Sequence, residues 1–185
     1  MNHQSAISFN DIIQFWFDDL APSQWWATDP ELDQQITKRF SDLHAQAIAG
    51  ELSARRSTAE GRLAEIIVLD QFSRNIYRND ARAFANDEQA LQLSRAAIEA
   101  GDDQKLEPTQ RAFLFLPFMH SESAKVHEQA VKLYDQPGLE NNLEFEHKHK
   151  VIIDRFGRYP HRNEVLGRQS TPEELEFLKQ PGSSF

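Results

Sequence analysis

The sequence contains no cysteine. Disulfides, thiolate metal sites and cysteine nucleophiles all need a thiol group, so each of them is excluded. A chain without cysteine is compatible with a reducing compartment. Side-chain chemistry at a functional site must therefore come from charged, hydroxyl, amide or imidazole groups.

Long apolar runs are also missing. The longest extends from Ala112 to Met119, well short of the ~20 residues that cross a membrane. Residues 1–10 lack the basic stretch and the apolar segment of a secretory signal. We therefore expect a cytoplasmic protein without a membrane partner.

Positive charge is scarce over the chain as a whole. The formal net charge of -9 argues against a nucleic-acid partner, because phosphate backbones bind to basic surfaces. From His147 to Arg168, however, six Lys or Arg side chains stand against two acids, a local balance of +4. A basic patch on an acidic body predicts a small anionic ligand or an acidic peptide as the partner. The composition does not indicate an oligomeric state.

The remaining composition is typical of a folded protein. Hydrophobic residues make up 39% and charged residues 26% of the chain. A chain of 185 residues that folds as one domain buries roughly 70% of its unfolded surface. We expect a single domain over residues 1–185.

Helix signals recur along this domain, whereas the alternating pattern and Asn-Gly turns of β-hairpins are missing. Capping side chains, first-turn prolines and terminal glycines predict about eight or nine helices. Pro117 is expected to end one of them and Ser121 to cap the next. The expected segments are 8–17, 30–50, 58–77, 86–101, 108–117, 121–134 and 143–156, with short helices that begin at 160 and 172.

Two of these segments, 90–98 and 124–131, resemble each other at a separation close to the ~34-residue period of tetratricopeptide repeats. Short connections favour antiparallel neighbours. The predicted fold class is therefore all-α, a tetratricopeptide-like superhelix of antiparallel helical hairpins.

Asp70, Arg74 and Arg78 follow one another at four-residue intervals, so they share one stripe of a helix. Leu63 and Ile67 continue this stripe, which predicts that it faces the core. One interpretation is an Asp70–Arg74 ion pair that joins neighbouring helices. The other interpretation is an unmatched arginine that binds an anion, because one carboxylate cannot satisfy two guanidinium groups.

A second cluster lies in the basic segment, where Arg158, His161 and Arg162 surround Pro160. Pro160 predicts a helix start, whose free N–H groups attract anions. The three side chains are suited to bind a carboxylate or a phosphate. A solvated basic turn is the alternative interpretation.

The histidines form no metal motif. His147 and His149 are two residues apart and point to different faces of a helix, so they cannot share one ion without distortion. The one other metal site would have to be gathered by the fold from Asp70, His120, His147 and His161. We expect no metal and no cofactor.

Several segments carry a resemblance to a known family. They are LDQFSRNIYR at 69–78, MHSE at 119–122, FGRYPHRN at 156–163 and LGR at 166–168, with the aromatic groups at 15–17 and 25–26 and the terminal GSSF. In these segments the chain resembles the bacterial family called domain of unknown function 924, over nearly its whole length. The resemblance implies a tetratricopeptide-like, right-handed α-superhelix and no established activity. Ser73 departs from the family pattern, which more usually has proline there.

We predict a binding module that captures an anionic small molecule or a peptide carboxylate. Its predicted pocket residues are Asp70, Arg74, Arg78, His120, Arg158, His161 and Arg162. One alternative is a hydrolase-type enzyme in which His120 or His161 transfers protons and arginine stabilises negative charge. A structural scaffold without a ligand is another. No catalytic residue is assigned, and Phe185 is a candidate for docking against the arginines.

Overall fold

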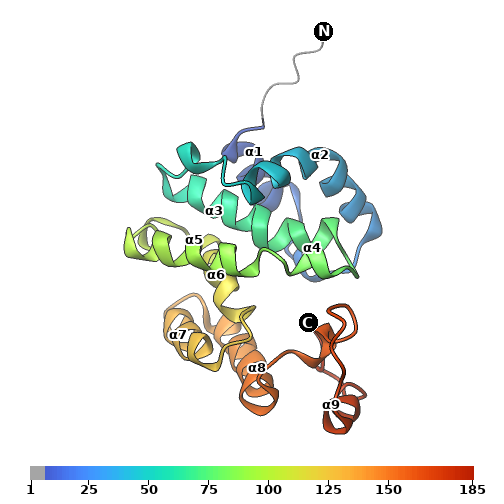
Figure 1. The fold of residues 1–185 in the computed structure, drawn as a ribbon. Helices are drawn as coiled ribbons and strands as arrows, with labels where there is room; N and C mark the ends of the chain where they lie inside the picture. The colour runs from blue at the N-terminus through green and yellow to red at the C-terminus, as the bar shows by residue number, and fades with distance from the viewer. Residues whose placement is uncertain (1–6) are drawn as a thin grey trace.

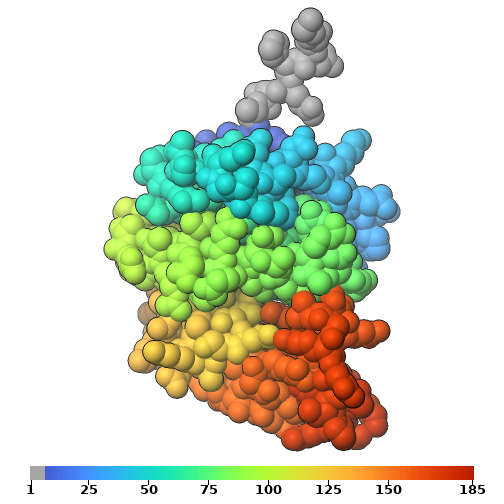
Figure 2. All heavy atoms as spheres, viewed as in Figure 1, coloured from blue at the N-terminus to red at the C-terminus, as the bar shows by residue number. Residues whose placement is uncertain are grey.

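The computed structural model describes residues 7–185, and the chain is all-α over this range, without a β-strand. Residues 1–10, for which the sequence predicts no targeting signal, lie largely outside the described residues. The helices follow one another in layers from one end of the molecule to the other (Figure 1). Figure 2 shows the same order on the surface, where the N-terminal, middle and C-terminal segments form successive bands.

Nine labelled α-helices account for most of the described residues. In chain order they are α1 (Phe9–Gln14), α2 (Pro30–Ile48), α3 (Ala59–Ile67), α4 (Ser73–Ile76), α5 (Asp87–Glu99), α6 (Pro108–Met119), α7 (Ala124–Tyr134), α8 (Glu140–Phe156) and α9 (Pro172–Phe177). Short turns of π-helix or 3₁₀-helix connect several of them, among them Phe15–Asp19, Val68–Phe72 and Pro160–Arg162.

Most helix ends follow the predicted local chemistry. The side chains of Ser8, Asp29 and Thr58 accept first-turn N–H groups of α1, α2 and α3, which satisfies donors that lack helical partners. Gly157 ends α8 with a φ of 70°, a left-handed conformation that glycine adopts without steric cost.

Two predicted helix boundaries are wrong. Helix α6 continues through Pro117 to Met119, because all its residues from Ala112 onward are buried in the core and this packing outweighs the one hydrogen bond that proline cannot make. Helix α7 begins after Ser123 rather than Ser121. The Ser121 hydroxyl instead accepts the N–H of Ser123, the residue just before α7.

One large hydrophobic cluster joins the helices from α1 to α7. A small separate cluster lies at α8 and the turn after it. Helix α6 links the two regions, since it packs against α3 and α5 on one side and against α7 and α8 on the other. Its C-terminal end therefore lies where the N-terminal layers meet the C-terminal helices (Figure 1).

Neighbouring helices pack together in sequence, α5 on α6, α6 on α7 and α7 on α8. The tetratricopeptide-like superhelix itself stays a prediction. None of the described helices combines the length and the apolar character that a membrane crossing requires.

Candidate functional site

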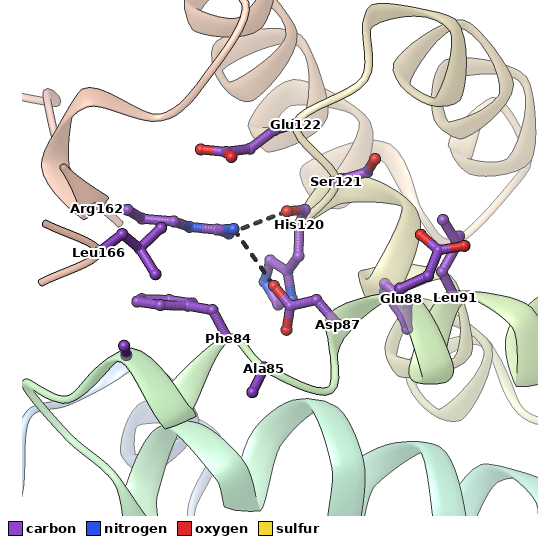
Figure 3. Close-up of a pocket in the computed structure, with 12 residues that line it drawn as sticks. Phe84, Ala85, Asp87, Glu88, Leu91, His120, Ser121, Glu122, Arg162 and Leu166 are labelled. Carbon is purple, nitrogen blue, oxygen red and sulfur yellow. Dashed lines mark hydrogen bonds and ion pairs between the residues drawn. The ribbon is translucent and has the colours of Figure 1, made fainter. Parts of the chain in front are cut away.

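A pocket of about 470 Å³ opens at this junction (Figure 3). Its walls come from the segment before α5 and the start of that helix, from the end of α6 and the residues after it, and from the segment that follows Pro160. They comprise Ala81, Phe84, Ala85, Asp87, Glu88, Leu91, Pro117, His120, Ser121, Glu122, Arg162 and Leu166. A mixed apolar and polar lining and a volume of this order are usual for small-molecule sites.

His120, directly after α6, forms a partly buried pair with Asp70 of the Val68–Phe72 turn. Nδ1 of His120 lies 2.7 Å from Oδ1 of Asp70, and Asp70 is only 1% exposed. The side-chain amide of Gln71 donates to the other carboxylate oxygen at 2.7 Å. The pair thus joins the N-terminal layers to the pocket.

The charges around this pair decide where its proton lies. Burial raises the pKa of Asp70, but His120 and Arg74 together outweigh that effect and hold it well below its usual range. Asp70 is therefore a carboxylate that accepts the hydrogen bond, and Nδ1 of His120 donates it. Burial, and next the positive charge of Arg74, lowers the pKa of His120. Near neutral pH the ring keeps one proton, on Nδ1, and Nε2 carries a lone pair.

Asp87, the first residue of α5, binds two arginines. Nη1 and Nη2 of Arg74 donate to its two oxygens at 2.8 and 3.0 Å. Nη1 of Arg162 approaches the same carboxylate at 3.3 Å. Burial lowers the pKa of Arg74, but Asp87 and then Asp70 raise it above its ordinary value. Arg74 is thus matched by acids, as the ion-pair interpretation of the sequence predicts, with Asp87 as the closer partner.

Arg162 is less completely matched. It is 6% exposed, its Nη2 donates to the carbonyl of His120 at 3.0 Å, and its buried Nε has no partner among the described residues. The guanidinium lies 4.5 Å from the ring centre of Phe84 and 4.7 Å from that of Tyr159. Burial, and next the like charge of Arg74, lowers its pKa. Figure 3 shows Arg162 reaching across the pocket wall towards His120 and Asp87.

The structure does not bring Arg78 and Arg158 into the pocket. Helix α4 ends at Ile76, so Arg78 leaves the stripe of Arg74 and donates to both oxygens of Asp33 at 2.5 and 2.8 Å. Arg158 donates to both oxygens of Glu174 at 2.7 and 2.8 Å. The predicted convergence of all four arginines is therefore wrong for these two, because carboxylates distant in the sequence hold them elsewhere.

His161 adjoins Arg162 but is not among the lining residues. Its buried Nδ1 has no partner within the described range. Burial, followed by the charge of Arg162, lowers the pKa of His161 to about 4. The ring is therefore neutral near pH 7 and less directly placed for proton transfer than His120.

Two other sequence hypotheses concern metal binding and the C-terminal ring. Within residues 7–185, no three His, Asp or Glu side chains are placed to hold a metal ion. The ring of Phe185 stacks on His149, with ring centres 3.7 Å apart, so the expected docking of this ring against the arginines is not what the structure has.

Some site residues have no signal in the sequence. Asp87 binds Arg162 across 75 residues, and an acid in the first turn of a helix is common on electrostatic grounds alone. Phe84 is likewise an ordinary aromatic residue until the fold places it under Arg74 and Arg162.

Comparisons with known proteins place the chain in a family. A family model described as "Bacterial protein of unknown function (DUF924)" matches residues 12–182. The solved structure of the protein of unknown function ATU0120 from Agrobacterium tumefaciens is 37% identical, with a TM-score of 0.88 over 92% of this chain and 96% of that one. Among curated proteins none matches. The chain belongs to the DUF924 family.

Proposed function

We propose that the pocket is the active site of a hydrolase-type enzyme in which His120 is the general base. The observation that carries this proposal is the Asp70–His120 pair, a buried carboxylate 2.7 Å from Nδ1. A carboxylate in that position fixes the ring and its tautomer and leaves Nε2 as the proton acceptor. His120 lines the pocket, where a substrate and a water molecule meet it.

The proposed reaction is the addition of water to an ester or a related acyl group. Nε2 takes one proton as the water oxygen bonds to the acyl carbon, and the negative charge that develops on the acyl oxygen is stabilised by Arg162. The bond to the leaving group then breaks, and the imidazolium returns the proton to it. One water is consumed, and His120 is neutral again. Asp70 stabilises the intermediate imidazolium through Nδ1.

Hydrolysis of p-nitrophenyl acetate by the purified protein tests this proposal. Because a positioned general base contributes about 10²- to 10⁴-fold, His120→Gln is expected to lower kcat/KM at least about 100-fold. His147→Gln is the matched control, since His147 is exposed on α8 and reports unspecific histidine reactivity. Equal rates for wild type and His120→Gln would contradict the proposal.

A binding module for an anionic group is the second candidate, favoured by the incompletely matched Arg162. Its guanidinium lies between two rings, with one buried N–H unpaired among the described residues. Asp87, Glu88 and Glu122 also line the pocket, which disfavours anions of high charge. A singly charged carboxylate that contacts Arg162 is the ligand this arrangement fits best.

Thermal unfolding in acetate and in chloride at equal ionic strength tests the second candidate. A ligand at ~100 times its Kd stabilises the folded state by ~2.7 kcal/mol. The shift is expected in wild type and in Arg155→Met, whose guanidinium is half-exposed on the surface, and not in Arg162→Met. Equal midpoints in acetate and chloride would reject this candidate, and a shift without turnover would favour it over the enzyme.

A further inference from the structure

Backbone carbonyls at the end of α6 are held by side chains from the C-terminal region. The carbonyl of Met119 accepts from the hydroxyl of Tyr159 at 2.5 Å, and that of His120 accepts from Arg162 at 3.0 Å. Carbonyls at a helix end have no helical N–H to accept from. The position of His120 therefore depends on groups beyond its own helix.

The next carbonyl, that of Ser121, is held by His127 of α7. His127 is completely buried, and its Nε2 lies 2.7 Å from the Ser121 oxygen. A carbonyl only accepts hydrogen bonds, so Nε2 must carry a proton and donate it. The other ring nitrogen, Nδ1, lies 2.7 Å from Oε1 of Glu146 on α8.

Two proton arrangements fit the contact between His127 and Glu146. Either a cationic ring donates to a carboxylate, or a neutral carboxylic acid donates to Nδ1. Glu146 is 0% exposed, and its second oxygen has no hydrogen-bond partner among the described residues. A charged carboxylate with an unsatisfied oxygen is much costlier in such surroundings than a neutral acid. Burial also raises the pKa of Glu146, which favours the same form.

We infer that Glu146, as a neutral acid, is a positioning residue for His120. Its O–H donates to Nδ1 of His127 and so fixes the tautomer whose Nε2–H holds the Ser121 carbonyl. The segment that carries His120 is thereby kept at the pocket while Asp70 orients the ring. The inference rests on the proposed function, because the group being positioned is the proposed base.

Substitutions of Glu146 separate a hydrogen-bond donor from a charge. In Glu146→Gln the amide N–H donates to Nδ1 as the acid does. In Glu146→Leu no donor remains, so the His127 ring loses its partner at Nδ1 and is held through the Ser121 carbonyl alone. Glu144 lies two residues before Glu146, on the exposed face of α8, and 65% of its side chain is exposed. Glu144→Gln and Glu144→Leu are therefore matched controls.

Long-range ¹H–¹⁵N NMR spectra of the histidine rings at pH 7 are the readout, together with p-nitrophenyl acetate hydrolysis. We expect a neutral His127 protonated on Nε2 in wild type and in Glu146→Gln, with rates within about twofold of each other. In Glu146→Leu we expect a His127 ring that is no longer fixed in one orientation, with broadened or shifted His127 and His120 resonances and a rate about tenfold lower. Both Glu144 variants are expected to match wild type.

A His127 ring protonated on both nitrogens in wild type would overturn the inference, and so would a Glu146→Gln variant that loses the tautomer. Glu146→Gln decides the question even if Glu146→Leu does not fold. Failure of the proposed function is distinguishable from failure of this inference. A hydrolysis rate that does not depend on His120 contradicts the enzyme alone, because the spectra of His127 and His120 still decide the positioning.

Discussion

The N-terminal layers and the C-terminal region of the molecule are each stabilised by a different kind of interaction. In the N-terminal layers, Phe72 is completely buried and packs against Phe15, Trp16 and Phe40, with ring centres 4.8 to 6.2 Å apart. This cluster continues without a break through α6 into α7. Apolar packing therefore dominates up to the helix that carries His120.

The C-terminal region has a much smaller apolar cluster, and ion pairs join its segments. Its fully buried apolar members are Ile152, Ile153 and Tyr159. The arginines of the basic segment instead pair with acids from elsewhere in the chain, Arg155 with Glu173, Arg158 with Glu174 and Arg168 with Glu122. The sequence predicts a basic patch here, but these charges are paired with acids, and the Arg168–Glu122 pair ties the C-terminal segment to the rest of the fold. We therefore expect this region to respond to pH and salt before the N-terminal core does.

Removing a large ring from the N-terminal core is expected to have the largest effect. Phe72→Ala leaves a cavity among three aromatic neighbours and should lower the free energy of unfolding by about 3–5 kcal/mol. Urea denaturation measures this loss. The control Phe145→Ala removes a ring that is 49% exposed and should cost less than about 1 kcal/mol. A similar cost for both variants would remove the contrast between core and surface.

Mild acid should act first on the C-terminal region. Burial lowers the pKa of His149 to about 3 and that of His161 to about 4, below the ~6.5 of an unfolded chain. Depressed pKa values mean that the stability is complete above about pH 6.5 and falls with pH, by up to about 1.4 kcal/mol per unit for each histidine. Hydrogen exchange at pH 6.5 and 5 should show faster opening of residues 140–185, reduced in the double variant His149→Gln, His161→Gln. Uniform acceleration along the chain would contradict this.

Substitution of a buried acid in the C-terminal region should have a smaller effect on stability. Glu174 is 2% exposed and accepts from Arg158 and from the backbone N–H of Thr171. Glu174→Gln weakens these bonds and is expected to cost about 1–2 kcal/mol. Exchange of amides near α9 should accelerate about tenfold, while those of α3 keep their protection. Equal acceleration in α3 would mean that the two regions open together.

The smallest effect is expected at the surface pair of Arg155 and Glu173, whose side chains are 46% and 65% exposed. Arg155→Ala should change the free energy of unfolding by less than about 0.5 kcal/mol, because water and salt screen such pairs. A loss above about 1 kcal/mol in a urea titration would show that exposed pairs also hold the C-terminal region.

Local features of the fold are predictable from the sequence, whereas contacts between distant residues are not. Ser8, Asp29 and Thr58 cap helices as their positions indicate, since capping depends on the next three residues only. The continuation of α6 through Pro117 depends on burial in the whole core, which no local pattern contains.

The same distinction applies to the site. The sequence predicts Asp70, Arg74, His120 and Arg162 as site residues, and the structure brings these four together. The predicted surplus of positive charge is not found, because Asp87 binds both Arg74 and Arg162. The sequence does not indicate this, since Asp87 lies 13 residues from Arg74 and 75 from Arg162. Three of the segments that carry the family resemblance, 69–78, 119–122 and 156–163, contribute these residues to one junction.

The protonation state of His120 tests the central claim most directly. Long-range ¹H–¹⁵N spectra at pH 7, assigned with His120→Gln, report which ring nitrogen carries a proton. We predict a proton on Nδ1, towards Asp70, and an unprotonated Nε2 at this pH. A proton on Nε2 at pH 7, in a neutral ring or in an imidazolium, would contradict the claim and leave the pocket without its base.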